Sequence, residues 1–246
     1  MLRISDMGRL YNIFLMMFFV VAILVFATSC ATYTTDFVTG QKTRNFYSVN
    51  DDIRMGNQTF AEIKAQMAKD GTAKVSTNQK DVNRVESIAN RIFDASGQRN
   101  TFDFSVTLFE SEVVNAFAVP GGKIAVFSGI WHPVKGLVTN DDELAAVIAH
   151  EVAHVTCRHS TEALTRQMPA QLVLTGLGIF AAAKEDPRWE AAADATFQLY
   201  NGLVVPKYSR ADEFEADRVS MQYMARAGFD PAAAVALWKR AYEKEG

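Results

Sequence analysis

Residues 141–160 read DDELAAVIAHEVAHVTCRHS, and the apolar run inside this stretch decides the fold. From Leu144 to Val155 nine residues are apolar, and only His150, Glu151 and His154 interrupt them. A helix with apolar residues on every face is buried nearly all round. The stretch therefore predicts a central helix that carries three ionisable side chains into the protein core.

The residues before this run predict where the helix begins. Asn140 followed three residues later by Glu143 has capping-box character, with Asn in place of the usual Ser or Thr. Asp141 and Asp142 favour a helix N-terminus because the helix dipole is positive there.

The three ionisable residues form the pattern H-E-x-x-H, which predicts a zinc site. Burying charged groups costs several kcal/mol unless something compensates, and a metal ion supplies that compensation. His150 and His154 lie one helical turn apart, so their rings can share one tetrahedral ion. Such an ion activates a water molecule, and Glu151 is the expected general base that takes its proton. We expect one Zn²⁺ per chain.

A third ligand must come from elsewhere in the chain. The metzincin spacing would need glycine at 157 and histidine at 160, where this sequence has Cys157 and Ser160. His159 is one position early, and a straight helix would turn it away from the metal. A His-His-Glu site is therefore the better hypothesis.

The best source of that carboxylate is the segment YSRADEFEADRVSMQYMARAG. Ser209 can cap its helix and Gly228 can end it. Glu213 as ligand, with Asp217 one turn later as acceptor for a histidine N–H, fits what zinc sites need. By spacing alone, the other acids of this segment, Asp212 and Glu215, compete for the role.

The remaining patterns predict an α+β fold that is mainly helical, with a small antiparallel sheet. Apolar alternation and turn residues predict three strands, at Phe102–Phe109, Val113–Val119 and Lys123–Ile130. Helical spacing predicts further helices at Asp52–Ala68, Lys80–Ala95 and Pro231–Lys244.

The first 50 residues indicate where in the cell the protein is located. Fifteen apolar residues from Ile13 to Ala27 suit a signal-peptide core better than a membrane span of about 20 residues. Thr28-Ser29-Cys30 resembles a lipobox, although Ala27 stands where leucine is commonest.

We therefore expect a signal peptide at 1–29, lipidation of Cys30 and a tether over 30–50. The alternative is an uncleaved N-terminal anchor helix. Ala31 after the cysteine suggests the periplasmic face of the outer membrane.

Composition excludes other classes. A formal charge of −3 over 246 residues gives no basic face for nucleic acid. Two cysteines, Cys30 and Cys157, cannot form a disulfide framework.

Three segments together resemble the metallopeptidase family of the CAAX prenyl protease, HtpX, the Oma-type peptidases and the BepA-like periplasmic peptidases. They are NAFAVPGGKIAVFSGI (115–130), DDELAAVIAHEVAHVTCRHS (141–160) and SRADEFEADRVSMQYMARAGFDP (209–231). The resemblance implies a zincin-like metallopeptidase domain over 51–246 and a lipoprotein member of the family. It also implies Glu213, the first Glu of E-x-x-x-D, as third ligand, with Asp217 behind it.

The same resemblance implies that the strand before the zinc helix binds substrate. In the family, substrate backbone adds to this edge strand. The expected substrate-binding residues are Asn115, Ala116, Phe117, Ala118, Gly121 and Gly122.

One feature departs from the family pattern. Members usually carry a further Ser/Thr-His-Pro segment with a downstream arginine, and the sequence to Gly246 does not contain one. The chain is then either a fragment or a short member, and the group that stabilises the transition state is unassigned.

The resemblance implies a zinc metalloendopeptidase that acts on unfolded or misassembled envelope proteins in protein quality control. Two alternatives stand beside it: a zinc-binding chaperone or assembly lipoprotein with weak or no proteolysis, and a purely structural lipoprotein.

Overall fold

The computed structural model describes residues 33–35, 38–168 and 208–245. The chain divides into two compact units, and the larger one contains residues 35–42, 47–161 and 208–246. In the smaller unit, the Phe46 backbone N–H donates to the Thr165 hydroxyl at 3.1 Å. The expected signal peptide and Cys30 lie outside the described residues.

The described part is mainly helical with a small sheet, which confirms the expected fold class. Within it, no helix has both the length and the apolar character to cross a membrane. The helices are α2 (Val49–Asp70), α3 (Gln79–Ala95), α4 (Asp141–Thr156), α7 (Arg210–Arg226) and α8 (Ala232–Glu245), and residues 159–168 are also helical. The strands of the main sheet are β3 (Lys74–Val75), β4 (Ser105–Glu110), β5 (Ala116–Ala118) and β6 (Lys123–Phe127). The expected tether contains two short paired strands, β1 (Tyr33–Thr35) and β2 (Lys42–Arg44).

The main sheet is mixed rather than wholly antiparallel. Its strand order is β3-β4-β6-β5, with β6 parallel to β4 and antiparallel to β5. After β4 the chain reverses to form β5, and it reverses again through Pro120–Gly122 to form β6. After the second reversal, β6 runs in the same direction as β4. Strand β6 lies between β4 and β5, so β5 forms the edge of the sheet.

Strand β6 is buried on both faces. Ile124 and Val126 belong to a core that includes α3, α4, α7 and α8. Ala125 and Phe127 belong to a second core with Phe60 of α2. Successive side chains of a strand point to opposite faces, so an unbroken apolar strand requires cover on both sides.

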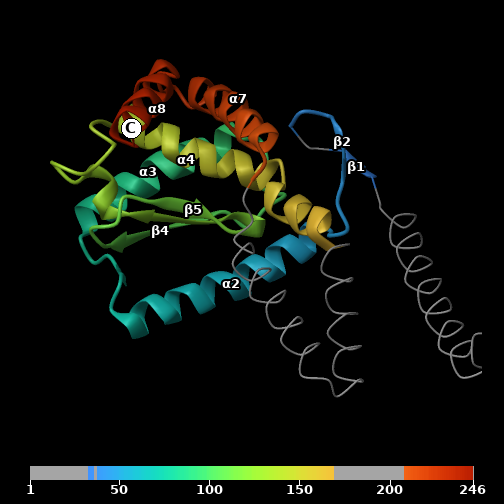
Figure 1. Cartoon of the computed structure of the whole chain (residues 1–246), viewed down its shortest axis with the longest axis horizontal. Helices are drawn as coiled ribbons and strands as arrows, with labels where there is room; N and C mark the ends of the chain where they lie inside the picture. The colour runs from blue at the N-terminus through green and yellow to red at the C-terminus, as the bar shows by residue number, and fades with distance from the viewer. Residues whose placement is uncertain (1–32, 36–37, 169–207, 246) are drawn as a thin grey trace, which may run out of the picture. The chain divides into compact units, whose positions relative to one another are not determined.

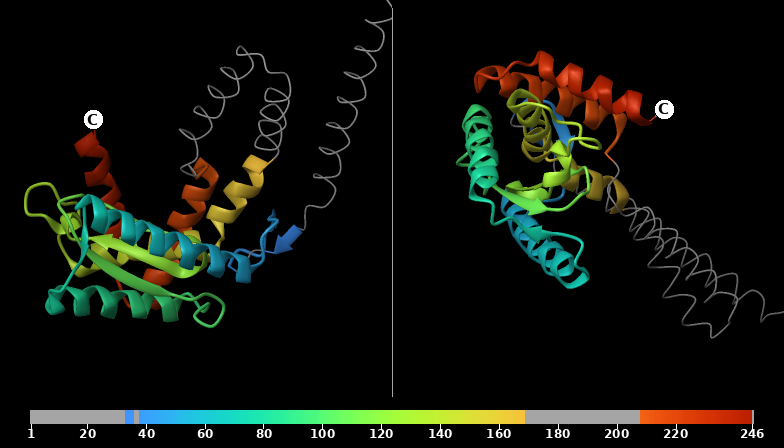
Figure 2. Two further views of the ribbon diagram at one scale, coloured as in Figure 1. Left: turned by 90° about the horizontal axis from the view of Figure 1, so that it is seen from below. Right: turned by 90° about the vertical axis from the view of Figure 1, so that its left-hand side faces the viewer.

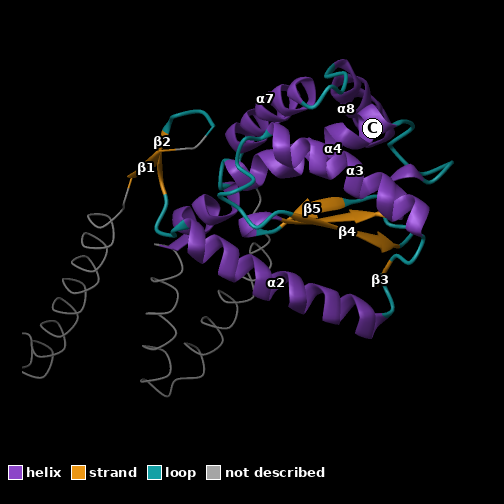
Figure 3. Ribbon diagram, turned by 180° about the vertical axis from the view of Figure 1, so that it is seen from behind, coloured by secondary structure: helices purple, strands orange, loops and turns teal. Residues whose placement is uncertain are grey.

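Helix α4 lies at the centre of the larger unit. It packs against α3, α7, α8 and the strands β5 and β6, while α2 packs on the opposite side of the sheet. Figures 1 and 3 show α2 on one face of the sheet and α3 and α4 on the other, with α7 and α8 beyond α4. The right-hand view in Figure 2 shows the sheet between α2 and the helices of the other face from a second side. The central position explains why the sequence of α4 is apolar on every face.

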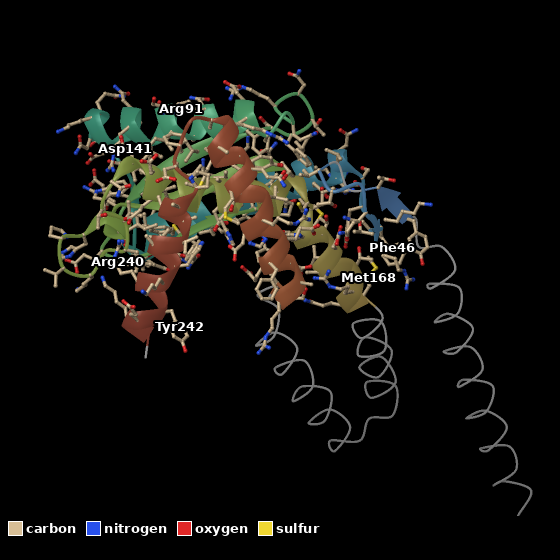
Figure 4. All side chains as sticks on the ribbon, turned by 90° about the horizontal axis from the view of Figure 1, so that it is seen from above. Phe46, Arg91, Asp141, Met168, Arg240 and Tyr242 are labelled. Carbon is tan, nitrogen blue, oxygen red and sulfur yellow. The ribbon has the colours of Figure 1, made fainter. Side chains whose placement is uncertain are left out.

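The cap of α4 differs in one bond from the expected capping box. The Asn140 side chain accepts from the Glu143 backbone N–H at 2.9 Å, as expected. The Glu143 carboxylate instead accepts from the backbone and hydroxyl of Thr139 and from Arg240 of α8. The guanidinium of Arg240, which is labelled in Figure 4, lowers the pKa of Glu143 despite its burial. This ion pair ties α8 to the start of α4.

A second buried ion pair ties α2 to the end of α4. The Arg158 guanidinium donates to Asp52 of α2 at 2.6 and 3.1 Å, and their side chains are only 5% and 2% exposed. Arg158 has a φ of 58°, a left-handed conformation that is costly for a residue other than glycine. The ion pair therefore stabilises a strained turn directly after the zinc helix.

We predict that Asp52→Ala lowers the free energy of unfolding by about 3–5 kcal/mol, because it leaves a buried guanidinium without its counter-charge. Arg54→Ala is the control, because Arg54 is 75% exposed in its pair with Asp51 and a surface pair contributes about 0–1 kcal/mol. Urea denaturation of both variants measures the difference. An Asp52→Ala loss no larger than that of the control would contradict a stabilising role for the pair.

Candidate metal centre and active site

Three side chains from two helices converge on one point. The Nε2 atoms of His150 and His154 on α4 lie 3.0 Å apart. The Glu213 carboxylate of α7 lies 3.3 Å from the first and 3.8 Å from the second. Each residue therefore offers one ligand atom to the same small volume.

This donor set fits zinc. Zinc bonds of about 2.0–2.2 Å in tetrahedral geometry separate the ligand atoms by roughly 3.3 Å, close to the three separations. With both rings neutral and their protons on Nδ1, the two Nε2 atoms and the Glu213 carboxylate oxygen are all acceptors, and a bound cation would satisfy all three. His150, His154 and Glu213 would hold the ion.

The ring of His150 is positioned by α7 and α8. Its Nδ1 lies 3.1 Å from Asp217, and its ring makes an edge contact with Trp238, with 5.4 Å between the ring centres. Burial disfavours the charged ring, but hydrogen bonds with Asp217 and Glu213 outweigh it and raise the pKa of His150 to about 9. The Asp217 carboxylate thus lies within hydrogen-bond distance of His150 Nδ1, and its predicted role as acceptor for this histidine stays a prediction.

The ring of His154 is more deeply buried. Tyr208 stacks on it with a centroid distance of 3.9 Å and an interplanar angle of 15°. Its Nδ1 lies 2.8 Å from Nδ1 of His159. Burial lowers the pKa of His154 to about 4, so this ring is neutral and ready to bind a cation.

Glu151 projects beside the ligand rings toward strand β5. The backbone N–H of Ala118 donates to its carboxylate. Burial raises the pKa of Glu151 to about 7, against the effects of His150 and this hydrogen bond. A carboxylate whose pKa lies near neutral pH is suited to accept and return a proton. The hydrogen bonds from His150 and His154 hold the pKa of Glu213 well below its usual range, so Glu213 is anionic.

The structure separates the four acids that compete on α7. Asp212 closes a capping box with Ser209 at the start of the helix. Glu215 lies 3.2 Å from Nε2 of His159, away from the ligand cluster. Glu213 and Asp217 are the two that lie beside His150, at 3.3 and 3.1 Å, and their roles as metal ligand and hydrogen-bond acceptor stay predictions.

Five of the six expected substrate-binding residues fall into two groups, and the sixth, Asn115, is exposed and directly precedes the first group. Residues 116–118 form β5, at the open edge of the sheet and next to α4. Gly121 and Gly122 are buried, and a Cβ atom on Gly121 would lie 2.4 Å from Cα of Ile53. Close packing against α2 accounts for Gly121, and the expected contact of both glycines with substrate stays a prediction.

Sequence reasoning missed the residues that surround the ligands. Tyr208 and Trp238 carry no motif, and only the folded structure brings their rings against His154 and His150. His159 does not lie on a straight continuation of α4, because α4 ends at Thr156 and the chain turns at Cys157 and Arg158. The turn returns His159 to the zinc helix, where it contacts a ligand ring.

Comparison with protein-family models matches residues 79–245 to peptidase family M48. The chain belongs to peptidase family M48. The match includes β4, β5, β6, α4, α7 and α8, and so contains the whole metal centre. The expected resemblance is thereby confirmed at the level of the family.

Curated relatives of this M48 chain are proteases. It is 33% identical over 211 residues to mitochondrial metalloendopeptidase OMA1 of Schizosaccharomyces pombe, covering 85% of this chain and 57% of the relative. It is 28% identical over 188 residues to the beta-barrel assembly-enhancing protease of Escherichia coli, covering 76% and 36%. It is 29% identical over 200 residues to OMA1 of Saccharomyces cerevisiae, covering 77% and 53%. The chain thus spans about a third to somewhat more than half of the length of these relatives.

We predict that zinc affinity of the M48 chain rises with pH up to about 9. A proton and zinc compete for Nε2 of His150, and below its pKa of about 9 zinc must displace that proton. The apparent affinity should increase about tenfold per pH unit between 7 and 9 and then level off. Chelator competition at constant ionic strength measures it, with the chelator's own protonation taken into account.

Asp217→Asn is the matched control for this measurement. It removes the carboxylate that most strongly favours protonated His150, so the affinity should level off at a lower pH. Equal affinities at pH 7 and 9 in the unmodified chain would refute the competition.

Proposed function

We propose that this chain is a zinc-dependent endopeptidase that cleaves extended segments of polypeptide. The observation that carries the proposal is the convergence of His150, His154 and Glu213, with the Glu151 carboxylate beside them. Membership of family M48 and relatives named metalloendopeptidase and protease support it.

The chemistry divides between the ion and the protein. Zinc, when bound, supplies a Lewis acid that polarises the scissile carbonyl and makes water acidic enough to attack at neutral pH. Glu151 takes the proton of the attacking water and later passes it to the leaving amine. The backbone of Ala118 lowers the pKa of Glu151 and so favours the carboxylate form that accepts the proton.

Strand β5 offers a backbone surface for the substrate. The Asn115 carbonyl accepts from Phe127 N–H, and the Val119 N–H donates to Lys123 carbonyl, so odd-numbered residues bond to β6. Ala116 and Ala118 consequently direct their N–H and C=O groups to the open edge. A peptide that adds there by main-chain hydrogen bonds would lie beside Glu151, with loose demands on its side chains.

Extended backbone is accessible in unfolded or misassembled proteins, which are the substrates that we propose. The E. coli relative is named a beta-barrel assembly-enhancing protease, and this name supports a role in quality control of envelope proteins.

We further propose that the protein is held at the periplasmic face of the outer membrane through a lipid on Cys30. The support is the sequence pattern of residues 13–31: an apolar core, small residues, the cysteine and the following Ala31.

Glu151→Gln tests the catalytic role of the carboxylate. We expect casein cleavage to fall by about 10²–10⁴-fold, because the amide cannot accept the proton of water. About one zinc per chain should remain bound, since Glu151 is not among the three ligands. Glu112→Gln, a change at an exposed acid, is the control and should cleave at the normal rate.

Zinc content and cleavage together separate the possible outcomes. Zinc bound without chelator-sensitive cleavage by the unmodified chain would favour the zinc-binding chaperone or assembly role. No bound zinc would overturn the metal site itself.

Ala116→Pro tests strand addition at β5. Proline removes an N–H that faces the open edge and leaves the bonds to β6 intact, as on natural edge strands. The loss of about one hydrogen bond should lower kcat/KM for a long unfolded substrate roughly tenfold. Ala116→Ser keeps the N–H and should retain activity. A proline variant with normal kcat/KM and an unchanged unfolding midpoint would exclude this edge as the substrate site.

A further inference from the structure

A chain of three side chains leads away from the proposed metal centre. His154 Nδ1 lies 2.8 Å from His159 Nδ1, and His159 Nε2 lies 3.2 Å from a carboxylate oxygen of Glu215. The side chains of His154 and His159 are each 1% exposed, and that of Glu215 is 20% exposed. The function proposed above assigns no role to His159 or Glu215.

Hydrogen-bonding rules fix the direction of this chain once a metal is bound. Two nitrogens at 2.8 Å share one proton. A metal bound to His154 Nε2 occupies the lone pair of that nitrogen. The proton of the neutral His154 ring then sits on Nδ1, which donates it to His159. His159 Nδ1 then accepts, and its own proton sits on Nε2 and is donated to Glu215. No other arrangement of neutral rings satisfies both contacts.

We propose that His159 and Glu215 are positioning residues that hold His154 in the tautomer and ring orientation that zinc requires. This inference rests on the metal site of the proposed function. His150 has the same device in a shorter form, with Asp217 directly at its Nδ1. Such partners of a metal-bound histidine typically change metal affinity by 10- to 100-fold.

The geometry of α7 explains why an imidazole lies between the Glu215 carboxylate and the ring of His154. Residues two apart on a helix point to nearly opposite sides, so Glu215 cannot face the cluster that Glu213 enters. The turn at Cys157 and Arg158 places His159 in the intervening space, and the ion pair of Arg158 with Asp52 stabilises that turn. His159 thereby connects a carboxylate of α7 to the ring of His154.

The same residues suggest a competing interpretation. Cys157, His159 and Glu215 could themselves hold a second metal ion. A metal on His159 Nε2 would force the proton of that neutral ring onto Nδ1, where it would meet the Nδ1 proton of metal-bound His154. The positioning role therefore predicts one zinc per chain rather than two.

Two substitutions of His159 in the full chain separate positioning from packing. Asn places its Oδ1 near the position of Nδ1, and Gln places its amide near the position of Nε2. Chelator competition should show zinc affinity about 10- to 100-fold lower for His159→Gln. His159→Asn should stay within about threefold of the unmodified chain, because it still accepts from His154. His132→Gln, at a histidine outside the site, is the control and should bind zinc normally.

A spectroscopic measurement on the unmodified chain does not depend on either variant folding. With ¹⁵N-labelled histidine and bound zinc, His154 should carry its proton on Nδ1 and His159 on Nε2. A His159 proton on Nδ1, two zinc ions per chain, or equal zinc affinities for His159→Gln and the unmodified chain would each overturn the proposal. Failure of the unmodified chain to bind zinc would instead overturn the proposed function.

Discussion

Three ionisable side chains on a helix that is buried on all sides impose the main constraint on this fold. Burial would cost each of these side chains several kcal/mol of solvation free energy if it had no interaction partner. The elements packed around α4 provide these partners. Helix α7 brings Glu213 and Asp217 to His150, the turn after α4 brings His159 to His154, and β5 directs the Ala118 N–H to Glu151. The contacts that pack the core around α4 are therefore the same contacts that form the candidate active site.

The turn after α4 contains both a buried ion pair that stabilises the fold and a residue that contacts the candidate metal site. Arg158 adopts a left-handed conformation there, and its buried ion pair with Asp52 joins residues 106 positions apart in the sequence. Because His159 is the next residue, the ion pair links α2 to a side chain that lies against the ring of His154.

The mixed sheet places an open backbone edge beside the proposed base. Strand β6 lies inside the sheet, where both its faces are covered, and this order leaves β5 at the edge next to α4. The bonds of β5 to β6 use its odd-numbered residues. The backbone of Ala118 in β5 lies close enough to Glu151 to lower the pKa of its carboxyl group, so the proposed base is next to this edge.

The sequence by itself determined α4, its reactive residues and the start of α7. The apolar run of α4, Asn140 as N-cap and Ser209 as N-cap are local properties, and each appears in the structure where it was predicted. Only the tertiary structure decided which acid of α7 meets which ring, why His159 reaches His154, and that β6 runs parallel to β4. Helical and strand periodicity describe a straight element. They contain no information on the turn at Arg158 or the insertion of β6 between two earlier strands, because both depend on contacts between residues far apart in the chain.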